Sequence, residues 1–115
     1  MPTLIIKTNA DLDGIDHPAL LRRASETMST MLGKPERYVM ISLEPTTAMC
    51  FGGDGTPCAY LELKSLGLPE KQTTVFSATL CAFLNDELGI AADRVYIEFA
   101  SPARHLFGFD GGTFE

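Results

Sequence analysis

The order of the candidate secondary-structure elements limits the fold most, because the same order occurs twice along the chain. Residues 2–45 predict a strand, a helix and a second strand, and residues 58–100 predict the same three elements again. A loop over 45–57, which contains three glycines, separates the two halves. We therefore expect one α/β domain over residues 1–115 that contains an internal repeat, with approximate boundaries 2–45 and 58–100.

The first half has clear signals for where its helix begins and ends. Residues 3–8 are a short, mostly apolar strand candidate, and residues 38–44 are a second one. Between them, Asp16 is a suitable helix N-cap, Pro18 fits the first helical turn, and Gly33 is a typical helix terminator. The apolar residues within these limits recur at helical spacing: Leu20, Leu21, Ala24, Met28, Met31 and Leu32.

The second half repeats this plan. Residues 58–64 alternate between apolar and polar side chains, as in a strand, and residues 95–99 predict another strand. We expect a helix that opens at Pro69 and Glu70 and ends at Gly89. Its apolar stripe consists of Phe76, Leu80, Phe83, Leu84 and Leu88. The two halves thus predict two pseudo-symmetric βαβ units.

Two helices are enough to cover only one face of the resulting four-stranded mixed sheet. Right-handed crossovers between parallel strands place both helices on the same side. Residues 4–6 and 38–41 nevertheless direct apolar side chains to both faces of their strands, and such strands are usually covered on both sides. We therefore predict that a second subunit covers the open face.

The charge of the chain excludes some classes of partner. Lys and Arg total 9 against 15 Asp and Glu, which gives a formal net charge of −6. An acidic domain is a poor binder of nucleic acids and of anionic membranes. The sequence has no run of about 18 apolar residues that would span a bilayer. Three cysteines in a chain of this size favour reduced thiols and a cytoplasmic location. The first seven residues read as a strand, not as a signal peptide, and export without a leader stays open.

Most catalytic motifs are missing. His17 and His105 are far apart and have no Cys or Asp at metal-ligand spacing, so we predict no metal site. The glycines of residues 51–55 fit a turn better than a phosphate-binding loop. The sequence lacks both the Gly-x-Ser-x-Gly motif of serine hydrolases and a Cys-x-x-Cys motif.

Pro2 is the first of two features that suggest chemistry. The initiator Met is commonly removed before a small second residue, and Pro2 would then carry a secondary amine. Burial and a neighbouring cation lower the pKa of an amine, and only the neutral amine is a base. The simpler interpretation is an ordinary second residue.

The second feature is the strand over 95–99. Period two places Tyr96 and Glu98 on one face and the apolar residues on the other. If that face meets another subunit, a phenol and a carboxylate would lie together at the interface. Spacing alone favours an exposed Tyr and a solvated Glu.

A set of short motifs in a characteristic order extends these observations. They are Pro2, Thr8-Asn9, Gly33-Lys34-Pro35, Tyr38, Met49-Cys50-Phe51-Gly52-Gly53, Pro57-Cys58-Ala59, Ser65-Leu66-Gly67, Asp93-Arg94-Val95-Tyr96-Ile97 and Gly112-Thr113-Phe114. In order and spacing, over essentially the whole chain, the sequence resembles the macrophage migration inhibitory factor family, which includes D-dopachrome tautomerase, in the tautomerase superfamily.

The resemblance implies a homotrimer whose active sites lie at the subunit interfaces. It implies keto–enol tautomerisation of phenylpyruvate-like aryl 2-oxo acids, and less securely of dopachrome derivatives, with the N-terminal proline as catalytic base. It implies no metal and no organic cofactor.

The resemblance also assigns roles to individual residues. Pro2 would be the base, Lys34 would hold the substrate carboxylate, and Tyr96 of the neighbouring subunit would line or polarise the pocket. The remaining substrate-binding candidates are Tyr38, Lys64, Ser65, Leu66, Glu98, Phe107 and Phe114.

Some positions depart from the pattern of the animal proteins. Glu98 stands where those proteins have Asn, Lys64 where a His is usual, and Phe109 in place of a Trp. Leu61 replaces the second cysteine of the family's thiol-redox motif, and the segment 101–105 differs at the rim of the site.

Two other functions stay open. One is a cytokine-like or host-mimic role through a protein receptor. The other, to which Glu98 points, is a different proline-based reaction on small unsaturated acids.

Overall fold

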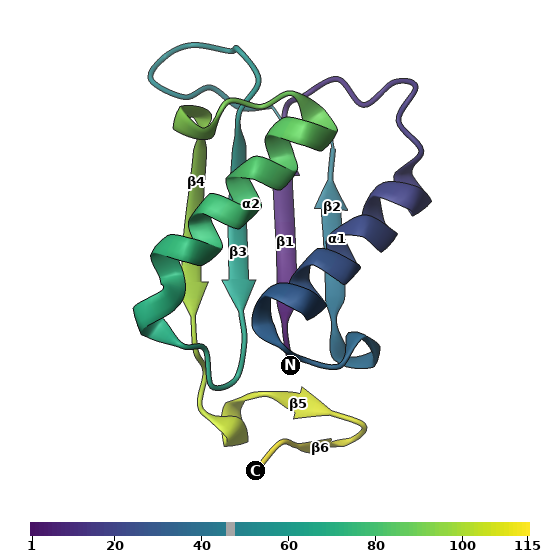
Figure 1. The fold of residues 1–115 in the computed structure, drawn as a ribbon, viewed down its shortest axis with the longest axis vertical. Helices are drawn as coiled ribbons and strands as arrows, with labels where there is room; N and C mark the ends of the chain where they lie inside the picture. Colours follow the sequence, from purple (N-terminus) through teal and green to yellow (C-terminus); the bar gives the residue numbers. More distant parts are fainter. Residues whose placement is uncertain (46–47) are drawn as a thin grey trace.

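The computed structural model describes residues 1–45 and 48–115, so residues 46 and 47 of the predicted glycine-rich loop lie outside the described residues. The chain forms a four-stranded sheet with two helices packed across one face (Figure 1). The main elements follow in the order β1 (Thr3–Thr8), α1 (His17–Leu32), β2 (Met40–Glu44), β3 (Ala59–Lys64), α2 (Thr73–Leu88), β4 (Val95–Ala100), β5 (Gly108–Phe109) and β6 (Gly112–Thr113).

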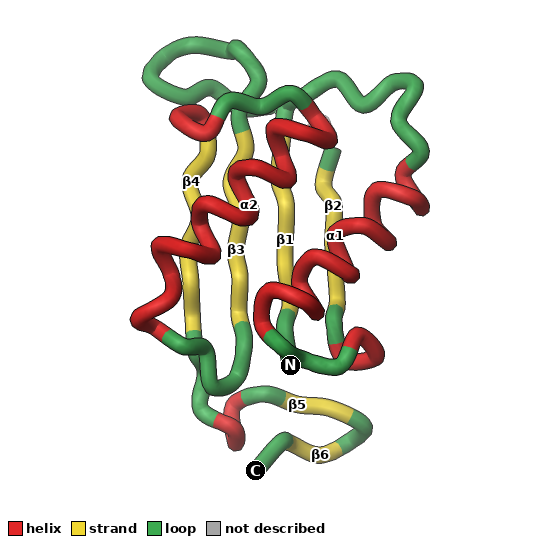
Figure 2. The backbone as a smooth tube through the Cα atoms, viewed as in Figure 1, coloured by secondary structure: helices red, strands yellow, loops and turns green. Residues whose placement is uncertain are grey.

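The sheet has the strand order β2-β1-β3-β4. β1 and β2 are parallel, β3 and β4 are parallel, and β1 and β3 are antiparallel. Each parallel pair is connected through one helix, so the chain consists of two βαβ units that meet at the central β1–β3 pair (Figure 2). This confirms the predicted mixed sheet with both helices on one face.

The helix signals in the sequence act as expected. The Asp16 carboxylate accepts a hydrogen bond of 3.0 Å from the amide of Ala19, which caps α1, and Pro18 lies in its first turn. Gly33 and Gly89 end the two helices in the left-handed conformation, with φ of 63° and 68°. The predicted stripes face inward, with Leu20, Ala24 and Met28 of α1 and Phe76, Leu80 and Leu84 of α2 buried.

Three elements begin one to four residues later than predicted. β3 begins at Ala59, one residue after Cys58. Tyr38 belongs to a 3₁₀ turn, Glu36–Tyr38, and β2 begins only at Met40. The amide of Tyr38 bonds to the carbonyl of Pro35 (3.1 Å), which closes a turn where the sequence predicted a strand. Similarly, Glu70–Gln72 forms a 3₁₀ turn before α2, because backbone amides there bond to carbonyls three residues earlier.

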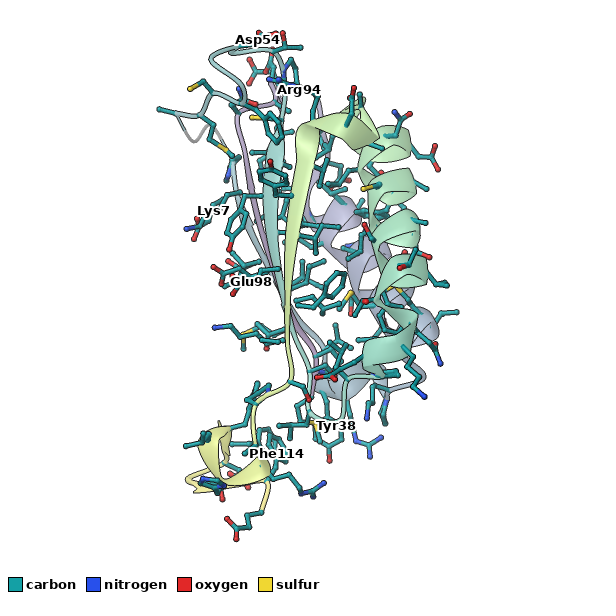
Figure 3. The ribbon with its side chains drawn as sticks, turned by 90° about the vertical axis from the view of Figure 1, so that its left-hand side faces the viewer. Lys7, Tyr38, Asp54, Arg94, Glu98 and Phe114 are labelled. Carbon is teal, nitrogen blue, oxygen red and sulfur yellow. The ribbon has the colours of Figure 1, made fainter. Side chains whose placement is uncertain are left out.

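The open face of the sheet is more polar than predicted. Ile5 and the exposed Met40 do lie there, in register with the uncovered side of β1. However, Lys7, Glu62 and Glu98 occupy the same face, and Figure 3 shows Lys7 and Glu98 directed away from the helices. A partner for this face would therefore meet a mixed surface of apolar, aromatic and charged groups.

The C-terminal segment lies at the end of the sheet where the chain begins. A 3₁₀ turn, Arg104–Leu106, leads into the β5–β6 hairpin, whose strands pair Gly108 with Thr113. The hairpin turns through Asp110 and Gly111, both at positive φ (52° and 78°). The N-terminus and this hairpin are close together in Figure 1, and Met1, Gly108 and Phe109 line the same small cavity.

Candidate functional site

Pro2 is held in the structure instead of fraying at the terminus. Its side chain is fully buried, and its carbonyl accepts a hydrogen bond of 3.0 Å from the amide of Met40. That bond extends the β1–β2 pairing by one residue toward the N-terminus. Pro2 itself does not line the pocket described next, whereas Met1, to which its nitrogen is bonded, does.

A pocket of about 610 Å³ lies at this end of the sheet. Four predicted site residues line it: Lys34, Tyr38, Leu66 and Phe114. Its other lining residues are Met1, Pro35, Gly67, Ser101, Pro102, Ala103 and Arg104. Residues from the first βαβ unit, the β3–α2 loop and the C-terminal segment therefore meet in one cavity, which sequence spacing alone does not place together.

The backbone of Lys34 is fixed by the end of α1. The amide of Lys34 donates to the carbonyl of Ser29 (3.2 Å), and the hydroxyl of Ser29 donates to the carbonyl of Lys34 (2.6 Å). Because Gly33 turns the chain out of the helix just before it, the lysine leaves the helix end and lines the pocket.

Aromatic rings form one wall of the site. Tyr38 meets Phe114 edge-on, with ring centroids 6.4 Å apart, and Phe109 stacks on Phe114 at 5.2 Å. Phe107 lies 5.8 Å from Phe114 and lines an adjacent cavity of about 190 Å³. Figure 3 shows Tyr38 and Phe114 together at this end of the molecule. Phe109 is a member of this wall that the sequence did not single out as a site residue.

The site carries positive charge and weakens the basicity of the N-terminal amine. Burial, and then the positive charges of Lys34 and Arg104, lower the pKa of the Met1 amine below its ordinary value. Arg104 was not predicted as a site residue. The only sequence signal was its place in the divergent segment 101–105, and that signal does not indicate which residue faces the pocket.

Tyr96 and Glu98 lie elsewhere in this subunit. Tyr96 is 67% exposed, and its ring packs 4.7 Å from that of Phe51. Tyr96 of β4 pairs with Tyr60 of β3, and Tyr60 pairs with Lys7 of β1. Lys7 is five residues beyond Pro2, or about 16 Å along the strand. Tyr96 of the same subunit therefore lies well away from the Pro2 pocket.

Glu98 lies on the open face, where it affects Tyr60. Burial, Glu98 and Glu62 together raise the pKa of the Tyr60 phenol, whose hydroxyl donates to Glu62 (3.3 Å). Of the last two candidates, Lys64 is exposed and pairs with Thr3, on the open-face side of β1. Ser65 is fully buried, its hydroxyl 3.5 Å from the carbonyl of Leu66. Neither residue is among those that line the pocket.

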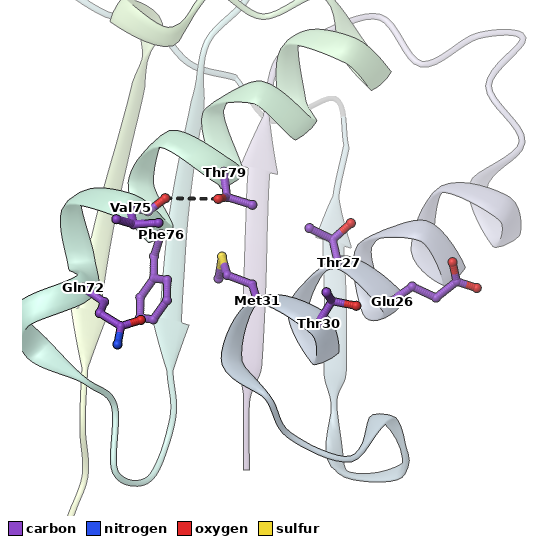
Figure 4. A pocket seen from close by; sticks show the side chains of 8 residues that line it. All are labelled: Glu26, Thr27, Thr30, Met31, Gln72, Val75, Phe76 and Thr79. Atoms are coloured by element: carbon purple, nitrogen blue, oxygen red, sulfur yellow. Dashed lines mark hydrogen bonds between the residues drawn. The ribbon is translucent and has the colours of Figure 1, made fainter.

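A second pocket, of about 500 Å³, lies between the two helices (Figure 4). Figure 4 shows Met31 of α1 and Phe76 of α2 among the residues that line it, and the hydroxyl of Thr79 donates to the carbonyl of Val75 (3.1 Å). Of the described residues, Glu26 is the only charged one in its lining, so none of them offers a cation there for an acidic substrate. None of the predicted site residues lines this pocket.

The described part of the chain shows no cluster of three or more His, Cys, Asp or Glu side chains able to hold a metal ion. In the same residues, no helix is long and apolar enough to cross a membrane. Cys50, Cys58 and Cys81 are free thiols, of which Cys58 is buried.

Comparisons with known proteins agree with this fold. The family model "Macrophage migration inhibitory factor (MIF)" matches residues 1–115. The chain is 40% identical to a macrophage migration inhibitory factor homolog of Brugia malayi and 32% identical to the macrophage migration inhibitory factor of Rattus norvegicus, each over 115 residues and 99% of both chains.

Solved structures give the same result. The crystal structure of a macrophage migration inhibitory factor homologue from Prochlorococcus marinus superimposes with a TM-score of 0.92 at 37% identity, covering 98% of this chain and 99% of the other. The protein from Trichinella spiralis gives a TM-score of 0.91 at 29% identity, covering 97% and 99%. On the full-length match and the shared fold, this chain belongs to the macrophage migration inhibitory factor family.

Proposed function

We propose that this protein is a keto–enol tautomerase of phenylpyruvate-like aryl 2-oxo acids, with Pro2 as catalytic base once Met1 is removed. The observation that carries the proposal is the position of the chain terminus at the pocket, where burial, Lys34 and Arg104 lower the pKa of the Met1 amine. Removal of Met1 would place the new Pro2 amine near the same two cations. A base acts best when its pKa lies near the working pH, and these surroundings favour the neutral amine.

The reaction needs one proton to leave carbon and one to reach oxygen. The Pro2 nitrogen takes a proton from the carbon next to the ketone, and the C–H electron pair forms the C=C bond. The carbonyl π electrons move to the oxygen, which then takes a proton from water. The hydroxide that remains takes the proton from the Pro2 ammonium and restores the neutral base, and the reverse sequence returns the keto acid. Lys34 orients the carboxylate, and positive potential stabilises the developing oxyanion. Leu66, Tyr38 and Phe114 supply an apolar wall for the aryl ring.

Tyr96 and Glu98 fit this scheme through a neighbouring subunit. They lie on the open face of the sheet, away from the pocket of their own chain. In a homotrimer built through that face, each subunit would present its Tyr96 and Glu98 to the Pro2 pocket of the next. Lys64, beside Thr3 on the same face, would lie near this junction. Sedimentation velocity tests the trimer directly.

A variant at Pro2 tests the function. In Pro2→Gly we expect the enol-to-keto conversion of phenylpyruvate to fall by at least about a hundredfold, because glycine supplies a primary amine of different basicity and geometry. Pro18→Ala, on the exposed start of α1, is the matched control and should keep full activity. Mass spectrometry of the N-terminus must show that Met1 is absent. Wild-type turnover in Pro2→Gly, or in protein that retains Met1, would refute the role of Pro2.

A cytokine-like signalling role is the second candidate, and the names of the animal relatives favour it. If that role is the main one, binding to a cell-surface receptor would survive Pro2→Gly while wild-type protein would show negligible tautomerase activity.

A further inference from the structure

Arg104 reaches the pocket from the C-terminal segment and is held there by one hydrogen bond. Its Nε donates to the carbonyl of Phe114 at 2.8 Å. The amide of Phe114 in turn bonds to the carbonyl of Phe107 (3.2 Å), which ties the last residues to the aromatic wall. The guanidinium is therefore oriented by backbone and does not depend on an acidic side chain.

The terminal nitrogens of Arg104 are unoccupied. Within residues 1–45 and 48–115 neither nitrogen has a hydrogen-bond partner or a carboxylate within 4.0 Å, and the bond from Nε is the only hydrogen bond of the guanidinium. The Glu115 carboxylate, at the end of the same segment, lies 3.9 Å from Nδ1 of His105 instead. An arginine in this state presents two parallel N–H donors, a geometry that matches a carboxylate.

Lys34 lines the same pocket and also has no ion-pair partner among the described residues. Two unpaired cations in one cavity are notable in a chain with a net charge of −6. Among the residues that the structure describes, no Asp or Glu lines this cavity. A substrate with one carboxylate would compensate one of the two charges and leave the other without a counter-ion.

We propose that Arg104 is a substrate-binding residue that takes a second acidic group, so that the pocket favours dianionic 2-oxo acids over monoanionic ones. The proposal rests on the function proposed above, in which Lys34 holds the carboxylate beside the reacting carbon. Arg104 then selects acids that carry a further carboxylate on the part of the molecule directed toward the C-terminal segment. The positive charge of Arg104 also lowers the pKa of the terminal amine, in the same direction as Lys34.

Binding of two inert acids tests this selection without any turnover. The probes are trans-cinnamate, with one carboxylate, and 4-carboxycinnamate, with two, titrated calorimetrically into N-terminally processed protein at low salt. We expect wild-type protein to bind the diacid at least about fivefold more tightly than the monoacid. Arg104→Ala should weaken diacid binding about tenfold and monoacid binding less than about twofold. Arg104→Lys should retain part of the preference for the diacid, because the positive charge remains while the two parallel N–H donors of the guanidinium are lost.

Two controls separate binding from structural damage. Arg22→Ala removes the same charge from α1, outside this pocket, and should leave both affinities within about twofold of wild type. Phe114→Ala disturbs the aromatic wall, so it should weaken binding of both acids. The proposal is overturned if wild-type protein binds the diacid no more tightly than the monoacid, or if Arg104→Ala weakens both acids equally.

The outcome is independent of the test of Pro2. A Pro2→Gly protein that loses turnover should still prefer the diacid. If Pro2→Gly keeps wild-type turnover, the proposed mechanism fails, while the titration still decides whether Arg104 binds a second carboxylate.

Discussion

The Arg94 guanidinium donates a hydrogen bond of 2.8 Å to the carbonyl of Phe51 and lies 5.1 Å from the centre of the Phe51 ring. The second terminal nitrogen donates to the carbonyls of Asp54 and Thr56, at 2.9 and 2.8 Å. One side chain thus holds the loop that supports Tyr96, since the ring of Phe51 packs against the Tyr96 ring.

Arg94→Lys should destabilise this loop. A lysine has a single nitrogen and cannot reach three carbonyls from one plane, so we expect a loss of about 1–3 kcal/mol in the free energy of unfolding. Urea denaturation measures the loss, and hydrogen exchange should show faster exchange at the amides of Phe51 and Asp54. Arg22→Lys on α1 is the control. An unchanged urea midpoint for Arg94→Lys would contradict this account.

The pH dependence of tautomerisation should follow the N-terminal amine. The neutral amine is the base, and it exists above the amine pKa, so kcat/KM should rise with pH through that pKa. Burial, Lys34 and Arg104 lower the pKa of the Met1 amine, and we expect the same surroundings to act on the Pro2 amine once Met1 is removed. The rise should therefore lie at lower pH than the titration of an unstructured peptide that begins with Pro2. Lys34→Ala removes one of these causes, so its rising limb should move to higher pH.

Arg22→Ala is the control for that shift, because it removes one positive charge far from the amine. Initial rates with phenylpyruvate from pH 5 to 9 are sufficient for the comparison. A rising limb that stays in place in Lys34→Ala would show that Lys34 does not act on the amine.

Mixed oligomers should reveal whether a site takes Pro2 and Tyr96 from different subunits. Pro2→Gly and Tyr96→Ala should each reduce activity strongly when assembled alone. In oligomers refolded from an equal mixture, half of the subunits carry an intact Pro2 and half of their neighbours carry an intact Tyr96. About one quarter of the sites should therefore regain both groups. Activity is measured after refolding, and the absence of any recovery would place both groups in one subunit or exclude Tyr96 from the site.

Truncation of a buried side chain of α2 should lower the free energy of unfolding far more than truncation of an exposed neighbour. Phe76 of α2 is 1% exposed, while the adjacent Val75 is 61% exposed. We expect Phe76→Ala to cost about 3–5 kcal/mol of unfolding free energy, through lost burial and the cavity that remains. Val75→Ala should change stability by less than about 0.5 kcal/mol. Equal losses of unfolding free energy for the two variants in urea denaturation would mean that Phe76 does not pack in the core beneath α2.

The repeat, the helix limits and the strand faces were predictable because local chemistry decides them. Asp16 caps α1 by accepting one hydrogen bond from the amide of Ala19, and Gly33 ends the helix with one backbone hydrogen bond to Ser29. Alternation alone places Tyr96 on the opposite face from Ile97. Tyr38 was misplaced because its 3₁₀ turn is accompanied by ring contacts with Phe109 and Phe114, about 70 residues later in the chain. Such contacts leave no trace in a local pattern.

The two cations of the pocket, Lys34 and Arg104, also differ in how far the sequence predicts them. The sequence alone determined the two βαβ units and the net negative charge. The resemblance to a known family added Pro2 and Lys34 as candidate site residues. Only the tertiary structure decided that Arg104 joins them, because its place depends on a backbone hydrogen bond to Phe114 and on the C-terminal segment folding back to the start of β1. Capping and alternation act between neighbours in sequence, whereas a pocket is formed by segments that meet only after the sheet has assembled.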